Sequence, residues 1–390
     1  MSEAAMYKSS MSKAIVTGFS NHSDPFLAAA ELQQQLVHND VGFVLFFCSA
    51  EYDLAHLAEA MNQAFDLVPL AGCTTAGEIT AQGYAQGAIS AIGFNRHHFA
   101  VEASLIEAMD NLSLTQAQST VESFINKGRA KQLAPIKGNS FVLTLLDGLS
   151  VQEEQVLATL SSALGNIPHF GGSAGDDIHL ANTHVFAHGA FHTGAAVVLL
   201  FNTDCEFEVF TTHHLKPLSE KLVVTAADRD NRRVHELNAE PAAQEYASLI
   251  GLSVADLNPE VFALNPLAVR IGNEFYVRAI QKVNADLSLT FYCAVENGIV
   301  LTRMHSDDIL KNLTTELECI EQNIGSPQLI IGCDCFLRRL EIEHLGIAAE
   351  ASELFRQHKV VGFNTYGEHL EGMHINQTFT GVVIGSPADD

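Results

Sequence analysis

A short pattern of small and acidic residues occurs three times in this chain, and its composition suits ligand binding. Two copies share the spacing Gly-x-x-Thr-x-Gly-Glu, and the middle copy is looser and one residue shorter. The copies cover residues 72–78, 171–176 and 362–368, and their hydroxyl and carboxylate residues are Thr75 with Glu78, Ser173 with Asp176, and Thr365 with Glu368. A carboxylate beside glycine at the end of a strand can bind a metal or orient a small ligand in a crevice. The favoured alternative is structural, because small residues allow close backbone packing and a carboxylate can cap exposed amides.

Histidine is concentrated in the middle of the chain, where seven of the 18 histidines lie between residues 169 and 214. Histidine is a ligand for metals and for heme iron, and it titrates near neutral pH. No spacing matches a zinc signature such as His-Glu-x-x-His or paired Cys-x-x-Cys. His192 and His214 border apolar, β-rich runs at 195–201 and 207–210. A flat apolar cofactor could pack against these apolar strands. For any single histidine, however, an exposed or hydrogen-bonded side chain is the default interpretation.

Cys333 and Cys335 end an apolar run that is typical of a buried strand. Two side chains at i and i+2 of a strand point the same way, so these thiols could share a soft metal or form a redox pair. Simple packing is the alternative. No Gly-x-Ser-x-Gly elbow or other enzyme signature is present, so we expect a protein that is not an enzyme.

The elements that must position these residues alternate between strands and helices. The first strands are expected at 14–20, 42–49 and 67–71, and the intervening helices at 24–36 and 52–65. This order is typical of a parallel α/β sheet. Later segments at 88–94 and 99–106 predict two strands, which are antiparallel if they are adjacent in a sheet. Segments 183–187 and 195–201 predict a hairpin. Each small-residue turn follows an apolar strand and precedes a hairpin.

Strand, helix, strand, turn and hairpin recur in the same order along the chain. We therefore expect an α/β fold built by internal duplication, with mixed, largely parallel sheets and antiparallel hairpins; two units are expected and three partial copies remain open. Lys216-Pro217 is the candidate boundary. The expected domains are 1–215 and 216–390.

The composition restricts the partners and the compartment. The chain has 390 residues and a net charge of −25, which disfavours nucleic acid and anionic membranes. Seven scattered cysteines give no secreted disulfide framework. No apolar stretch reaches membrane-spanning length. We expect a cytoplasmic protein without membrane insertion, and a homodimer is considered.

The three turns, taken together, resemble those of the FIST family of sensory proteins, with a FIST N half followed by a FIST C half. Val224-Thr225 and residues 236–243 also fit the C-terminal half. Within the family the chain looks most like the nitric-oxide-sensing heme branch, the NosP proteins. The segments that favour this branch are residues 211–214, 332–341 and 376–381.

This resemblance implies a noncovalent heme b that binds nitric oxide, and a partner that is a histidine kinase or a cyclic-di-GMP synthase or phosphodiesterase. We expect His214 as the proximal iron ligand and His192 as the second candidate. Two alternatives stay open. One is a heme-free FIST sensor for amino-acid-like ligands that uses the turns. The other is a thiol redox sensor that uses Cys333 and Cys335.

Overall fold

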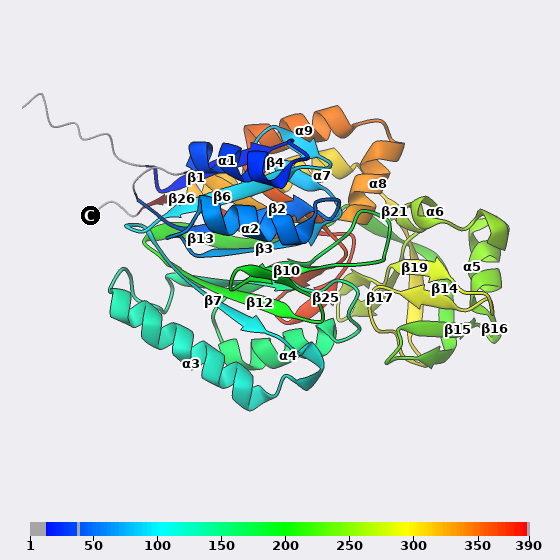
Figure 1. The fold of residues 1–390 in the computed structure, drawn as a ribbon. Helices are drawn as coiled ribbons and strands as arrows, with labels where there is room; N and C mark the ends of the chain where they lie inside the picture. The colour runs from blue at the N-terminus through cyan, green and yellow to red at the C-terminus, as the bar shows by residue number, and fades with distance from the viewer. Residues whose placement is uncertain (1–12, 37–39, 388–390) are drawn as a thin grey trace, which may run out of the picture.

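The computed structural model describes residues 13–36 and 40–387, and it contains three copies of one α/β unit plus a β-rich lobe (Figure 1). Unit one comprises β1 (Ile15–Ser20), α1 (Pro25–Leu36), β2 (Val41–Ser49), α2 (Leu54–Ala64), β3 (Leu70–Thr75), β4 (Glu78–Thr80), β5 (Gly83–Ala85) and β6 (Ile89–Asn95). Unit two comprises β7 (Phe99–Ile106), α3 (Leu114–Lys131), β8 (Ser140–Leu146), α4 (Glu153–Leu164), β9 (His169–Ser173), β10 (Val185–Ala187), β11 (Ala190–His192) and β12 (Ala196–Thr203).

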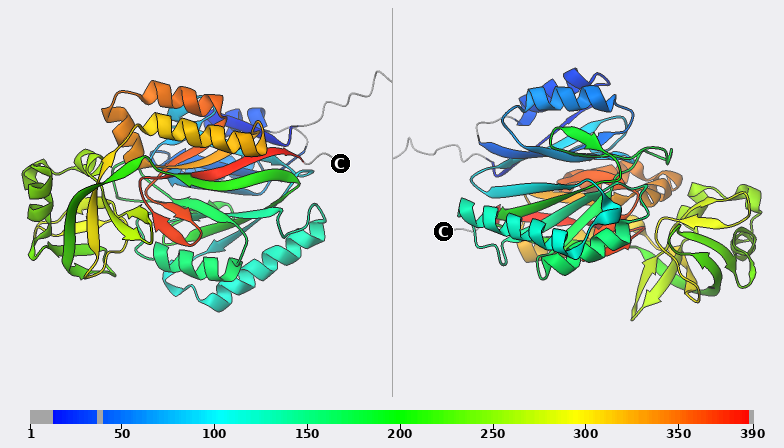
Figure 2. Two further views of the ribbon diagram at one scale, coloured as in Figure 1. Left: turned by 180° about the vertical axis from the view of Figure 1, so that it is seen from behind. Right: turned by 60° about the horizontal axis from the view of Figure 1, so that its bottom comes forward.

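Unit three is split in sequence by the lobe. It comprises β13 (Cys205–Thr212), α7 (Ile309–Ile324), β22 (Leu329–Cys335), α8 (Phe336–His344), α9 (Ala348–Gln357), β23 (Val360–Thr365), β24 (Glu368–Leu370), β25 (Met373–Ile375) and β26 (Phe379–Pro387). The lobe comprises β14 (Leu215–Asp228), β15 (Arg233–Leu237), β16 (Glu240–Pro241), α5 (Ala242–Ile250), α6 (Pro259–Leu264), β17 (Leu267–Ile271), β18 (Glu274–Val277), β19 (Ile280–Val283), β20 (Leu289–Phe291) and β21 (Val300–Ser306). The lobe stands at one side of the three-unit body in both views of Figure 2.

Each unit contributes four strands to a sheet in the same order, which is first, last, second, third: β1-β6-β2-β3, β7-β12-β8-β9 and β13-β26-β22-β23. The second and third strands are parallel in every unit, and the other pairs are antiparallel. The short hairpin that follows the third strand leaves its own unit. Hairpin β10–β11 extends sheet one, β24–β25 extends sheet two, and β4–β5 extends sheet three. The three units therefore exchange their hairpins cyclically around a pseudo-threefold axis.

One core is shared by all three units. The inner faces of the three sheets meet there, and rings from different units touch directly. Phe47 of unit one stacks on Phe363 of unit three at 4.5 Å between centroids. The outer faces are covered by α1 and α2, by α3 and α4, and by α7 and α9. The lobe has its own core around Tyr246 and Phe291.

The α/β class with mixed sheets and antiparallel hairpins is confirmed. The sheets are not largely parallel, because each unit has one parallel strand pair and its other pairs are antiparallel. The expected number of units is two, and the structure has three. One predicted hairpin is wrong, and the adjacency considered for a second pair of strands does not occur. Strands β6 and β7 lie in different sheets, and β10 pairs with β11 and β3 and not with β12. Adjacent segments suggested these pairs, but the exchange of hairpins between units overrides adjacency. The expected division at 215 and 216 falls where β14 enters the lobe, and unit three is built from residues on both sides of it.

Candidate functional site

The three small-residue turns come together at the carboxyl ends of the parallel strands. Thr75, Ser173 and Thr365 end β3, β9 and β23 and occupy equivalent positions. Backbone hydrogen bonds link every pair of turns: Ala76 N to Asn364 O at 2.8 Å, Gly175 N to Thr74 O at 3.1 Å, and Ser173 N to Gly367 O at 2.8 Å. All six residues predicted from the turns thus lie in one region around the pseudo-threefold axis.

The three carboxylates of these turns are buried and bonded to the protein. Glu78 accepts from Thr75 Oγ1 and the Ala88 N–H. Glu368 accepts from the N–H and hydroxyl of Thr378. Burial raises the pKa of Glu78 to about 7 and that of Glu368 to about 8.

Asp176 caps a loop, since it accepts from the N–H groups of Leu180, Ala181 and Asn182, and Tyr366 also donates to it. The hydrogen bonds of all three carboxylates therefore join strands and loops, which is the structural role that the sequence favoured.

His214 is buried in an ion network in which both of its ring nitrogens are engaged. Arg338 Nη1 donates to Nδ1 at 2.9 Å, so Nε2 carries the proton and donates to Glu341 at 2.9 Å. Asp334 accepts from Arg338 Nε at 2.8 Å. Burial lowers the pKa of His214, with the hydrogen bond to Glu341 opposing this. An iron ion would have to displace one of these bonds, so the environment of His214 does not fit an axial ligand.

His192 ends β11 in the hairpin that unit two contributes to sheet one. Its Nε2 lies 3.1 Å from the Ala187 carbonyl of the same hairpin. His192 and His214 therefore do not share a site in the structure. His192 lies at the edge of sheet one, and His214 lies in the ion network with Arg338 and Glu341.

His213, the neighbour of His214, lines a cavity of about 370 Å³ between the body and the lobe. Its Nδ1 is buried without a hydrogen-bond partner among the described residues. Burial lowers its pKa, with the neighbouring His214 and Arg338 acting in the same direction. A neutral imidazole is the form that binds iron. The other lining residues come from β13, β18, α7 and the β24–β25 hairpin: Thr211, Thr212, Glu274, Phe275, Tyr276, Val277, Asn312, Glu316, Leu370, Met373, Ile375, Asn376 and Thr378.

The sequence singles out His214, whereas the residue of this segment that lines the cavity is its neighbour, His213. Successive residues of an extended segment face opposite sides, so one of the adjacent histidines had to face away from the network. No sequence signal says which side carries a cavity, because the cavity is formed by the lobe and by α7, which are distant in sequence.

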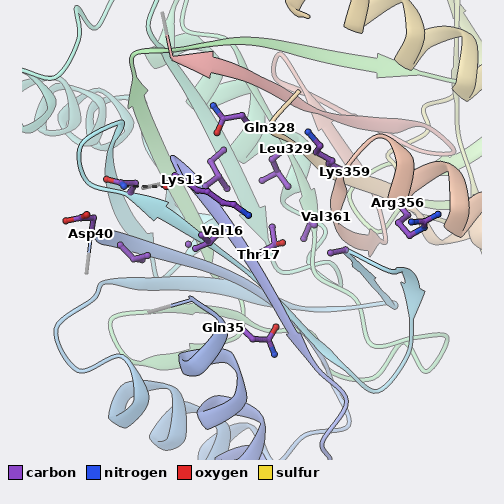
Figure 3. A pocket seen from close by; sticks show the side chains of 15 residues that line it. Lys13, Val16, Thr17, Gln35, Asp40, Gln328, Leu329, Arg356, Lys359 and Val361 are labelled. Carbon is purple, nitrogen blue, oxygen red and sulfur yellow. Dashed lines mark hydrogen bonds between the residues drawn. The ribbon is translucent and has the colours of Figure 1, made fainter. Parts of the chain in front are cut away.

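Another cavity lies at the other end of the sheets (Figure 3). Its volume is about 850 Å³, and it lies beside the first residues of β1, β2 and β22. Lys13, Arg356 and Lys359 are among its lining residues, and none of the lining residues that the structure describes is a histidine or methionine. Lys359 Nζ donates to the Pro327 carbonyl at 2.7 Å.

Cys333 and Cys335 lie on β22 and are free and fully buried. Burial raises the pKa of both thiols well above the ordinary value. A protonated thiol without access to solvent is a poor nucleophile. This environment disfavours a redox role and supports packing.

The structure is thus a body of three α/β units with an attached lobe, a buried polar axis and a cavity between body and lobe. Family models match over most of the chain: the FIST N domain over residues 42–240 and the FIST C domain over residues 242–371. The chain belongs to the FIST family, whose domains are sensory domains in signal transduction. No curated protein matches the chain.

The two family models meet inside the lobe, between β16 and α5. The structure has no break there, since β15 pairs with β16 and α5 packs on β15. Within residues 13–36 and 40–387, none of the helices combines the length and apolar character that crossing a bilayer requires.

Proposed function

We propose that this FIST protein binds heme b and reports nitric oxide to a partner histidine kinase or cyclic-di-GMP enzyme. The observation that carries the proposal is His213, which lines a cavity and whose Nδ1 has no hydrogen-bond partner among the described residues. Burial lowers its pKa, which favours the neutral imidazole. Heme iron is commonly held by one histidine, or by histidine with methionine. Met373 lines the same cavity and offers a thioether.

The cavity volume of about 370 Å³ is at the lower end for ligand pockets. The proposal therefore requires that a bound porphyrin keep an edge outside the cavity. Phe275, Val277 and Ile375 supply apolar lining for the part inside. Bound heme would supply a ferrous iron that takes nitric oxide.

The position of His213 couples the cavity to the relative placement of body and lobe. Residues 213 and 214 connect β13, which belongs to sheet three, with β14, which belongs to the lobe. His214 fixes this junction to α8 through Arg338 and Glu341. A bond from His213 to a bound iron would add a second restraint on this junction. Loss of that bond would free the lobe side of the junction. A partner enzyme that binds body and lobe together would then meet a different surface.

The test is reconstitution of purified full-length protein with hemin, followed by the Soret spectrum of the reduced protein with and without nitric oxide. We expect the wild type to show a Soret band that nitric oxide shifts. His213→Ala should lose at least about tenfold in heme affinity, because it removes a ligand.

His192→Ala is the matched control and should load heme as the wild type does. His214→Gln keeps hydrogen-bonding capacity at the junction. This variant should still bind heme if His214 only positions the junction and is not itself an iron ligand. Full heme loading by His213→Ala with an unchanged Soret maximum would refute the assignment. Wild-type protein that stays colourless in excess hemin would refute the heme proposal itself.

A second candidate function rests on a cavity of about 270 Å³ beside the first turn. Arg339, Asp177 and Glu343 line it, together with Ala76 of that turn. A guanidinium and two carboxylates suit the carboxylate and ammonium groups of an amino acid. Colourless protein whose melting temperature rises with free amino acids, and not in Asp177→Asn, would favour this heme-free sensor.

A further inference from the structure

A second cluster of ligand-type side chains is buried where units two and three meet. Glu153 is the first residue of α4 in unit two, while His369 and His374 are paired across the β24–β25 hairpin of unit three. One ligand atom from each of the three lies within 4.8 Å of the others, and all three residues are buried. The hairpin exchange creates this cluster, because it brings unit three onto sheet two.

The separation of Glu153 and His374 suits two ligands on one ion better than a hydrogen bond. His374 Nε2 lies 3.6 Å from Glu153 Oε1, beyond hydrogen-bond distance. Zinc bonds to nitrogen and oxygen are about 2.0–2.2 Å, so two ligands of a tetrahedral ion lie about 3.3–3.6 Å apart. Nε2 has no hydrogen-bond partner among the described residues. Gly367 makes room for it, since a Cβ there would lie 1.8 Å from this atom.

One tautomer of His369 leaves a lone pair directed at the same region. The Thr144 hydroxyl lies 3.3 Å from the Phe170 carbonyl and 2.9 Å from His369 Nδ1. In one tautomer of His369, Thr144 donates to Phe170 and accepts from the Nδ1–H. The Nε2 of His369 is then unprotonated. Ser173 Oγ lies 3.0 Å from Nε2 but donates its own proton to Glu153.

Arg232 holds the two carboxylates beside the cluster. It donates to both Glu153 and Glu154, and this pairing limits the cost of their burial.

We propose that Glu153, His369 and His374 form a binding site for one divalent transition-metal ion. Two imidazoles and one carboxylate are a donor set for Zn²⁺ or Fe²⁺. The outer partners are already in place, because Thr144 orients His369 and Arg232 holds the other oxygen of Glu153. The ion joins units two and three at the hairpin whose neighbouring residues, Met373 and Ile375, line the cavity of His213.

The test is a titration of heme-free, chelator-treated full-length protein with Co²⁺, whose visible absorption reports coordination. We expect one equivalent to bind with the bands of a low-coordinate site, and Zn²⁺ to displace it. Glu153→Gln and His374→Gln should each weaken binding by at least about tenfold. Circular dichroism confirms that each variant is folded, and Glu153→Gln is nearly isosteric, so a folding failure of the histidine variant leaves the test intact.

Three controls separate this site from its rivals. His213→Ala should bind Co²⁺ normally, which distinguishes this site from the heme proposal. Cys293→Ser and Glu154→Gln should also bind normally, although Cys293 and Glu154 lie near the other nitrogen of His374. A thiolate charge-transfer band that Cys293→Ser abolishes would assign the ion to that second cluster and overturn the proposal. Absence of any spectral change or thermal shift with Co²⁺ or Zn²⁺ would also overturn it.

Discussion

Burial decides the behaviour of the acidic residues that repeat in the three turns. Glu78 and Glu368 have no exposed surface, and burial raises the pKa of both. One oxygen of Glu368, Oε1, has no hydrogen-bond partner among the described residues. A protonated Glu368 avoids placing an uncompensated charge at this point.

The raised pKa of Glu368 predicts a specific pH dependence of stability. Between its ordinary pKa near 4.5 and its folded pKa of about 8, the folded state binds more protons than the unfolded state. The contribution of protonated Glu368 to the stability of the folded protein is therefore complete below its ordinary pKa near 4.5. This contribution is lost as the pH rises through its folded pKa of about 8. Glu368→Gln cannot titrate, so we expect the difference in unfolding free energy between variant and wild type to shift in favour of the variant by about 2–3 kcal/mol from pH 5.5 to 8.5.

Urea unfolding of both proteins at several pH values measures this difference. Glu353→Gln is the control, because Glu353 is exposed and pairs with Arg356 on the surface. Parallel stability curves for wild type and Glu368→Gln would show that Glu368 is charged throughout this range.

At the scale of elements, glycines permit the close contact between the parallel strands. A Cβ at Gly72 would lie 2.2 Å from the Phe46 carbonyl oxygen, and one at Gly362 would lie 1.8 Å from the Gly332 carbonyl oxygen. Both positions are the first glycine of their turn pattern. The repeated pattern therefore encodes strand packing in units one and three.

Gly72→Ala and Gly362→Ala should each destabilise the protein by about 3 kcal/mol, because the added methyl group forces paired strands apart. Gly18→Ala in β1 is the matched control. Its Cβ would meet only side-chain atoms of Gln35 and Leu36 at 3.1 Å or more, so a cost below about 1 kcal/mol is expected. Chemical denaturation measures all three, and equal costs would argue against the carbonyl contacts as the cause.

At the scale of the whole molecule, the exchange of hairpins makes the three units depend on one another. Each sheet is completed by a hairpin from another unit, and all three share the central core. The lobe has a separate core and enters the body through residues 213–214 and 307–308. The body should therefore unfold as one cooperative unit, and the lobe is able to open separately.

Native-state hydrogen exchange tests this arrangement. The slowest amides of β2, β8 and β22 should report the same opening free energy, while those of β15 and β20 in the lobe should report a lower one. A unit whose central strand exchanges independently of the other two would contradict the shared core.

The sequence by itself predicted the α/β class, the alternation of strands and helices, and the three turns. It also singled out the segment that contains His213 and His214. These follow from local causes: apolar periodicity, glycine at turns and the spacing of repeated residues. The tertiary structure alone decided which hairpin completes which sheet, which of two adjacent histidines lines a cavity, and that Glu153 meets His369 and His374. The physical reason is that these contacts join segments far apart in the sequence. Glu153 and His374 are about 220 positions apart, and Ile79 of β4 and Gly362 of β23 are about 280 positions apart. Such contacts depend on packing between units, which no local pattern records.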